Sequence, residues 1–491
     1  MSLRSKTLTG LFWSAVEKWG RRLISLGVFA LLARLLDPSA FGLVSLAGVY
    51  IAFMKTFVKQ GFVAALVQRE ELRPSHLDTT FWINTFFSAV MALATLWLAA
   101  PVARLFNEPE LAKIIRWLAP VFIIHGLSAV QQGLFRRHLE FQVLSVRTVI
   151  STISGGIVGV LMAFQGYGVW SLVGKQLTAQ TVGMAALWTA SDWRPRFHFS
   201  IDRFNELFSF SAYVMGSNLL GFANRRADDL LIGAFLGSTA LGYYTIAYKL
   251  LRTMTKSISK VVSQVTFSTF SRMQDDPERM RSAFYKATNL MAVIAVPVFI
   301  GMCVTAPEVI PAFFGDQWGP SVPVMQVLAL IGMLHSVFYF NGNVLNAMGK
   351  SSWRFGLGIL NAVCNTMGFF LAVWWWGSIV AVAAAYVGRA YLLAPIKLYA
   401  VRNLISIEYS TYLRQFRVPA LGTAVMSLAV VALRFWLAPV LRLYPLLGVL
   451  ISTGAVVYAS VVLLIKPSYL TEVRNLTGGL ISALKKELAG S

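Results

Sequence analysis

Long runs of apolar residues, separated by short polar turns, fill almost the whole 491-residue chain. An α-helix needs about 20 such residues to cross the hydrocarbon core of a bilayer. The runs do not alternate apolar and polar positions, which excludes a membrane β-barrel. The pattern predicts an all-α integral membrane protein with about 14 transmembrane helices. They are expected over residues 11–34, 40–66, 79–102, 112–134, 145–165, 168–190, 207–232, 241–270, 284–306, 321–347, 354–376, 378–400, 415–437 and 445–465.

The composition supports this prediction, because 57% of the residues are apolar and only 13% are charged. Soluble domains have about 45–50% apolar and about 25% charged residues. A soluble multidomain enzyme, a disordered scaffold and a secreted disulfide framework are therefore excluded. The two cysteines, Cys303 and Cys364, lie in apolar runs and are expected to be free, buried thiols.

Basic residues in the loops set the expected orientation. The chain has 43 Lys and Arg against 21 Asp and Glu, and cytoplasmic loops carry the basic excess of membrane proteins. With the N-terminus inside, the outer turns hold only Arg34, Arg104 and Arg442. Both termini are therefore predicted to be cytoplasmic. Many other basic residues fall within the predicted spans, where a charge is costly unless water or protein surrounds it.

An internal repeat relates the two halves of the chain. Segment 36–47 matches segment 236–247, with identities at Leu36, Ala40, Gly42 and Ala47. Each half holds six predicted spans, so both halves enter the membrane from the same side. We expect two parallel six-helix lobes around a central cleft, plus two C-terminal helices. The expected lobes are 1–200 and 201–405, followed by two peripheral transmembrane helices at 406–470 and a cytoplasmic tail at 471–491.

A stripe of basic residues runs along the span 241–270. Its members are three or four residues apart, so they share one helical face. The first two spans of each half carry similar residues, which predicts a cationic cleft for an anionic substrate, since Arg grips phosphate bidentately. The alternative is that these charges lie at helix ends near anionic headgroups. The candidate binding residues are Lys18, Arg21, Arg22, Lys55, Lys59, Arg225, Lys249, Arg252, Lys256 and Lys260.

Four further titratable residues are candidates for coupling or charge pairing. Glu17 and Asp228 either neutralise basic neighbours or couple transport to an ion or proton. His125 and His335 occupy corresponding places in the two halves and either sense protonation or are hydrogen-bonded core histidines.

Catalytic motifs are absent from the sequence. There is no Walker A pattern, no His/Cys metal cluster and no G-x-S-x-G. We therefore expect no catalytic residue, no metal and no cofactor. Transport would be driven by an ion gradient, H⁺ or Na⁺, or by the substrate gradient.

Several motifs carry a family resemblance that covers nearly the full length of the chain. They lie at 32–42, 65–69, 106–111, 168–173, 193–196, 228–233, 240–250 and 270–279. With these motifs the chain resembles the Wzx-like polysaccharide and lipopolysaccharide exporters (flippases) of the multidrug/oligosaccharidyl-lipid/polysaccharide exporter superfamily, especially the colanic-acid-exporter-like subgroup. One position departs from the family pattern. Lys59 in the Phe57–Gly61 segment stands where the family often has Asp, so any ion-coupling role of that Asp does not carry over.

The resemblance implies a transporter rather than an enzyme. Its substrate would be an undecaprenyl-diphosphate-linked oligosaccharide repeat unit, flipped across the bacterial inner membrane by alternating access for exopolysaccharide or lipopolysaccharide assembly. Expected partners are this polyprenyl-diphosphate-linked oligosaccharide, the lipid bilayer and the polysaccharide polymerase and assembly proteins, with no nucleic acid. The alternatives are a multidrug exporter or a peptidoglycan lipid-precursor flippase of the same superfamily and, more distantly, a membrane glycan polymerase or ligase.

Overall fold

A computed structural model describes residues 20, 24–58, 63, 66, 73–198, 200, 222, 226–258, 270, 273, 276–467 and 469. The secondary structure of these residues is helical, without a strand among them. Eleven helices in this part of the chain are long and apolar enough to cross a membrane. The prediction of an all-α, multi-pass membrane protein is confirmed. Segment 168–190 is also helical, whereas most of the predicted spans 11–34 and 207–232 lies outside the described residues.

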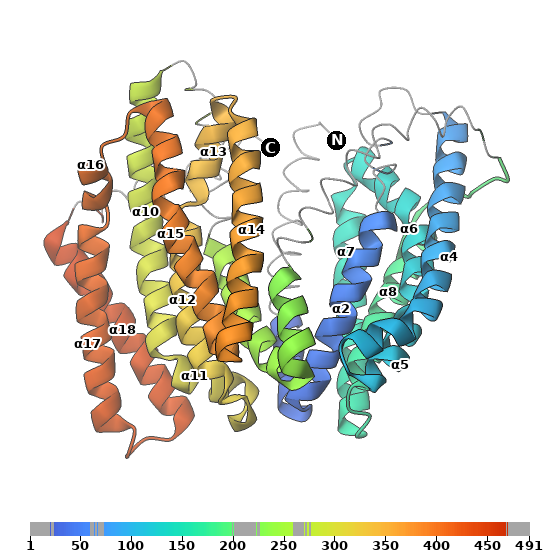
Figure 1. Cartoon of the computed structure of the whole chain (residues 1–491), viewed down its shortest axis with the longest axis horizontal. Coiled ribbons are helices and arrows are strands. Elements are labelled where there is room, and N and C mark those ends of the chain that lie inside the picture. Colours follow the sequence, from blue (N-terminus) through green and yellow to red (C-terminus); the bar gives the residue numbers. More distant parts are fainter. Residues whose placement is uncertain are drawn as a thin grey trace, which may run out of the picture. The chain divides into compact units, whose positions relative to one another are not determined.

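The described residues form two compact units (Figure 1). The first contains the residues up to Thr245 together with Phe369–Val382, and the second contains Ile246–Gly368 and the residues from Ala383 onward. The first unit therefore also includes the end of one helix and the start of the next, within residues 369–382. The lobe boundaries expected from the sequence stay a prediction.

The helices of the first unit follow the predicted spans, and prolines stand at several of their starts. Proline suits the first helical position because its missing N–H has no partner there. Pro120 splits the predicted span 112–134 into two helices. The helices are α2 (Pro38–Val58), α4 (Pro74–Leu105), α5 (Pro109–Leu118), α6 (Pro120–Arg137), α7 (Phe141–Phe164) and α8 (Trp170–Ala190).

A further helix runs from Arg226 to Ile258 and spans the boundary of the two units. The sequence predicts a turn between residues 232 and 241, and the structure has Gly237 there with φ of 84°. A positive φ is easily adopted only by glycine. The Tyr244 hydroxyl lies 3.1 Å from the Asp228 carboxylate, although a straight helix would hold these residues about 24 Å apart. The helical stretch therefore reverses direction near Gly237, where the sequence predicts the turn between two spans.

The second unit contains the remaining helices. They are α10 (Pro277–Val304), α11 (Ala306–Phe314), α12 (Ser321–Val337), α13 (Tyr339–Ala347), α14 (Ser351–Trp376), α15 (Ile379–Ile405), α16 (Tyr409–Arg414), α17 (Arg417–Leu437) and α18 (Leu443–Ile465). A 3₁₀ turn, η1 (Asp316–Trp318), connects α11 to α12. Figure 1 shows α17 and α18 as an antiparallel pair, and α17 packs on α10.

Small residues allow close helix packing in the first unit, as is usual between membrane helices. In the α7–α8 pair, a Cβ added at Gly155 would lie 2.6 Å from the Lys175 carbonyl oxygen. The indole N–H of Trp188 then ties α8 to α6 by donating to the Leu127 carbonyl over 3.0 Å. These contacts make α6, α7 and α8 one packed group.

A buried ion pair fixes α17 against the rest of the second unit. Arg434 on α17 lies 2.6 Å from the carboxylate of Glu308 on α11, and Glu308 is only 6% exposed. Arg434 also donates to the Val304 carbonyl at the end of α10. On α18, the Tyr458 hydroxyl donates to the Val293 carbonyl of α10 over 2.7 Å.

Candidate functional site

In the first unit, the backbone of α2 closely approaches that of the helix Arg226–Ile258 at two glycines. A Cβ added at Gly42 would lie 1.7 Å from the Ser238 carbonyl oxygen, and one at Gly242 would lie 2.0 Å from the Pro38 carbonyl oxygen. Real Cβ atoms do not come so close to a backbone oxygen, so both positions need glycine. The two contacts are reciprocal, because Gly42 and Gly242, like Pro38 and Ser238, occupy matching positions of segments 36–47 and 236–247.

A polar contact lies one helical turn beyond the two glycines. The Thr245 hydroxyl donates to the Ser45 hydroxyl oxygen over 3.2 Å. Leu46 beside it is buried and would lie 2.2 Å from a Cβ added at Gly233. The two matching segments therefore pack against each other through corresponding residues.

Glu108 adds a third connection close to the two glycines. Its carboxylate accepts the backbone N–H of Ser238 over 3.0 Å. Ser238 directly follows Gly237, so the carboxylate accepts a backbone N–H at the start of the helical segment that follows this glycine. The start of a helix is a favourable place for a negative charge. Glu108 stands just before α5 and so links the α4–α5 turn to the helix Arg226–Ile258.

Asp228 lies in a buried polar group on the helix Arg226–Ile258. One of its carboxylate oxygens accepts the Tyr244 hydroxyl over 3.1 Å, and the other accepts the Asp229 N–H over 3.0 Å. The ion pair of Arg226 is formed with Asp229, over 2.6 Å. Tyr244 is fully buried and both carboxylates are 5% exposed. The two predicted roles of Asp228, charge pairing and coupling, both stay open.

Four of the predicted binding residues lie in the described part of the chain. Lys55 is on α2, and Lys249, Arg252 and Lys256 are on the helix Arg226–Ile258. Lys55 and Lys249 are half-buried, whereas Arg252 and Lys256 are exposed. The other candidates lie outside the described residues: Glu17, Lys18, Arg21, Arg22, Lys59, Arg225 and Lys260. The cationic cleft therefore stays a prediction.

The two histidines occupy different units. His125 is half-buried on α6 in the first unit. His335 is on α12 in the second unit, where its ring lies edge-to-face on Tyr386 of α15 at 5.8 Å between centroids. The contact agrees with a core histidine, and the protonation-sensing role stays a prediction.

Sequence reasoning did not single out Arg389 on α15, which lies in a polar group between α12, α14 and α15. Its guanidinium donates to the Asn361 side-chain oxygen and lies 5.2 Å from the Tyr386 ring centroid. Its Nε atom is buried and has no hydrogen-bond partner among the residues that the structure describes. The sequence does carry one sign of an unusual arginine here, which is the lack of acidic residues around it. No Asp or Glu occurs between Asp316 and Glu408, so α12–α15 offer this cation no opposite charge.

Residues 31–323 match a protein family described as "Polysaccharide biosynthesis protein". The chain belongs to this family. The match begins just before α2 and ends in α12, so it covers both the glycine contacts and the basic stripe. The predicted resemblance to polysaccharide exporters is confirmed.

Two relatives of known name agree with this family assignment. The chain is 27% identical to the teichuronic acid biosynthesis protein TuaB of Bacillus subtilis (strain 168), over 87% of this chain and 89% of that protein. It is 30% identical to the succinoglycan biosynthesis transport protein ExoT of Rhizobium meliloti (strain 1021), over 74% of each.

A solved structure shares the fold of this polysaccharide biosynthesis protein. The lipid II flippase MurJ in an inward closed conformation superposes with a TM-score of 0.77, covering 94% of this chain and all of that one. The sequence identity is 12%. At that identity the likeness extends to the fold alone.

Proposed function

We propose that this protein flips undecaprenyl-diphosphate-linked oligosaccharide repeat units across the bacterial inner membrane, for exopolysaccharide or lipopolysaccharide assembly. One observation carries the proposal: the chain is a multi-pass helical membrane protein that matches the polysaccharide biosynthesis family over residues 31–323. The relatives of the chain include a protein named for succinoglycan transport. The chemistry is transport, so no bond is made or broken in the substrate.

The diphosphate is the part of the substrate that the basic residues suit. Lys249, Arg252 and Lys256 share one helical face, with spacings of three and four residues. Arg binds phosphate oxygens through two parallel N–H groups, and Lys acts as a point charge. Together with Lys55 and the candidates outside the described residues, they would form the cationic cleft between two six-helix lobes.

The reciprocal glycine contacts support a two-lobed transporter. Each lobe would contribute one of the two helices that meet at Gly42 and Gly242. The positive-inside rule would place this crossing on the outer side of the membrane. Alternating access requires a contact that closes one side of the membrane and later separates. The crossing at Gly42 and Gly242 would close the outer side, with Ser45, Thr245 and Glu108 adding polar links that can re-form.

Arg389 would provide an additional contact for the substrate. A guanidinium with a buried, unpartnered Nε on helices that lack acidic residues suits an oxyanion. Both termini would be cytoplasmic, and an H⁺ or Na⁺ gradient would drive the conformational cycle. The polysaccharide polymerase would receive the flipped unit on the outer side.

A deletion strain tests the proposed function. Loss of the surface polysaccharide, with the lipid-linked unit accumulating in the inner leaflet, is the expected result. Complementation with a Lys249→Ala, Arg252→Ala double variant should fail although the protein is inserted. An Arg442→Gln variant, which changes an exposed arginine in a turn predicted to lie on the outer side, should complement. Lipid-linked units that reach the outer leaflet of the deletion strain without being joined would contradict the flippase and favour a polymerase.

A further inference from the structure

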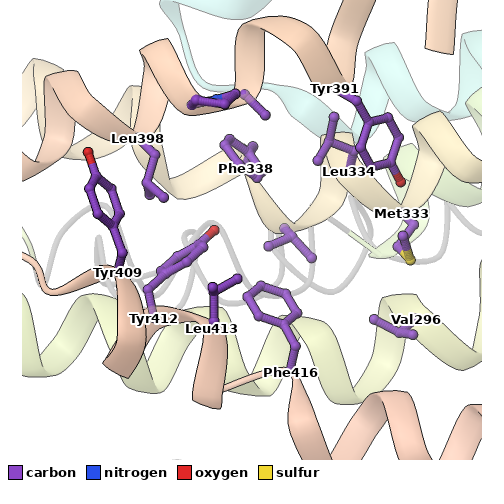
Figure 2. A pocket seen from close by; sticks show the side chains of 13 residues that line it. Val296, Met333, Leu334, Phe338, Tyr391, Leu398, Tyr409, Tyr412, Leu413 and Phe416 are labelled. Carbon is purple, nitrogen blue, oxygen red and sulfur yellow. The ribbon is translucent and has the colours of Figure 1, made fainter. Parts of the chain in front are cut away.

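A cavity of about 600 Å³ opens within the second unit, between α10, α12, α15, α16 and the start of α17. Figure 2 shows that its wall consists of aliphatic and aromatic side chains from these helices. None of the described residues that line it is charged, and the polar atoms of their side chains are the hydroxyls of Tyr391, Tyr409 and Tyr412 and the sulfur of Met333. Pockets of about 300–1,000 Å³ with such walls take apolar ligands of moderate size.

Tyr412 brings an unsatisfied polar atom to this apolar space. The residue is 3% exposed, and its hydroxyl has no hydrogen-bond partner in the described part of the chain. Its ring is held in place by Phe284, with which it stacks at 6.0 Å, and by Phe416 at 5.4 Å. In Figure 2 the hydroxyl points toward the side chains that surround the cavity. A buried hydroxyl without a hydrogen-bond partner is energetically unfavourable, so a ligand oxygen that accepts from Tyr412 would remove this penalty.

The other tyrosines define the rim of the cavity. The Tyr391 hydroxyl is already used, because it donates to the Leu330 carbonyl over 3.2 Å. Tyr409 is exposed, and the Arg402 guanidinium lies over its ring at 4.9 Å from the centroid, a cation–π contact. Arg402 is in the last turn of α15, in a segment that the positive-inside pattern places on the cytoplasmic side. One end of the apolar cavity therefore carries an exposed positive charge.

Neighbouring charges leave this end positive. Glu408 precedes Tyr409, and its carboxylate accepts the Thr411 hydroxyl over 2.9 Å. Arg281 nearby donates to the Ser406 carbonyl and pairs with Glu278 at 3.5 Å. Arg402 and the exposed Arg414 outnumber Glu408 at this surface. An anionic group would be attracted here, and basic pockets between helices on the cytoplasmic side are typical sites for anionic lipid headgroups.

We propose that this cavity binds an anionic phospholipid of the cytoplasmic leaflet. One acyl chain fills the apolar space, the phosphate lies on Arg402, and the Tyr412 hydroxyl donates to an ester oxygen of the lipid. The volume suits one acyl chain, whereas the much longer polyprenyl chain of the transported lipid would extend far beyond it. Because α10, α12, α15 and α16 all line the cavity, the bound lipid stabilises their packing and raises the thermal stability of the protein.

Native mass spectrometry of the purified full-length protein tests this proposal. Phosphatidylglycerol, phosphatidylcholine, glycerol 3-phosphate and undecaprenyl phosphate are titrated separately, and the melting temperature is followed in parallel. Phosphatidylglycerol should bind most tightly and raise the melting temperature, and glycerol 3-phosphate, which lacks the chain, should do neither. Arg402→Gln should weaken the binding of phosphatidylglycerol about fivefold, as expected for one basic residue at a membrane surface. It should leave the binding of phosphatidylcholine unchanged.

Three more variants separate the cavity from the surface charge. Ala394→Trp fills the cavity and should abolish retention of both phospholipids. Tyr412→Phe keeps the shape of the wall and should weaken the binding of both phospholipids to the same extent. Arg442→Gln, at a distant exposed site, should change the binding of neither. Equal retention of phosphatidylglycerol by the Arg402→Gln and unmodified proteins would overturn the proposal. Displacement of phosphatidylglycerol by equimolar undecaprenyl phosphate would do so too, because it would make the prenyl chain the occupant.

Discussion

Ser45 and Thr245 form a hydrogen bond of 3.2 Å between residues that occupy the same position in two matching segments of the chain. One turn earlier, Gly42 and Gly242 each face a backbone carbonyl of the other segment. A contact between equivalent residues is what a two-fold relationship between α2 and the helix Arg226–Ile258 would produce. In the proposed transport cycle, this contact forms when the outer side is closed and separates when it opens.

The two glycines should not tolerate even one added methyl group. Gly42→Ala and Gly242→Ala each place a Cβ against a carbonyl oxygen, at 1.7 and 2.0 Å. Overpacking of this kind costs about 1–3 kcal/mol, so each variant should have a lower melting temperature and reduced export. Gly48→Ala is the matched control on α2, because a Cβ there meets nothing within 4 Å. In a helix this change should be neutral or slightly stabilising. Equal behaviour of Gly42→Ala and Gly48→Ala would show that the close approach has no consequence.

A disulfide in place of the Ser45–Thr245 hydrogen bond should arrest transport. Ser45→Cys with Thr245→Cys puts two sulfurs where two oxygens are 3.2 Å apart, and Cys303 and Cys364 are first replaced by Ser to exclude other pairings. Oxidation should form the cross-link and stop export, and reduction should restore it. Each single-cysteine variant serves as a control and should export under both conditions. Full export by the cross-linked protein would mean that this contact never separates.

The ion pair between Glu308 and Arg434 should contribute strongly to stability. Removing one partner of a buried pair leaves an unpaired charge and typically costs about 3–5 kcal/mol. Glu308→Gln should therefore lower the melting temperature markedly. The double variant with Arg434→Met removes both charges and should recover most of the loss. A double variant as unstable as Glu308→Gln would assign the effect to packing rather than charge.

Arg389→Gln tests the cation that the sequence pattern did not single out. If Arg389 contacts the substrate, export should fall about tenfold or more, the loss expected for a charged hydrogen bond of about 1.5–3 kcal/mol. The melting temperature should change little, because glutamine can still donate to Asn361. Arg389→Lys keeps the charge and should retain part of the export. Loss of stability and export together, with no rescue by lysine, would indicate a purely structural role.

The helices and the family could be predicted from the sequence, because long apolar runs and local motifs determine both. The repeat was visible in the identities at Gly42 and Gly242, but their contact was not, since it depends on how two distant helices cross. Pro120 marks the division of α5 from α6, although hydropathy alone joined them. The surroundings of Arg389 could not be predicted from the sequence, because its partners Asn361 and Tyr386 are neutral. Only the packing of α14 and α15 brings them together.

Reconstitution of the purified protein in liposomes tests the central claim most directly. A fluorescent undecaprenyl-diphosphate oligosaccharide is incorporated, and its distribution between leaflets is read with a membrane-impermeant quencher. The unmodified protein should equilibrate the lipid-linked oligosaccharide between the leaflets but leave labelled phosphatidylcholine in place, and the Lys249→Ala, Arg252→Ala variant should equilibrate neither. Failure of the correctly folded, unmodified protein to move the lipid-linked oligosaccharide, with the required ion gradients supplied, would contradict the account.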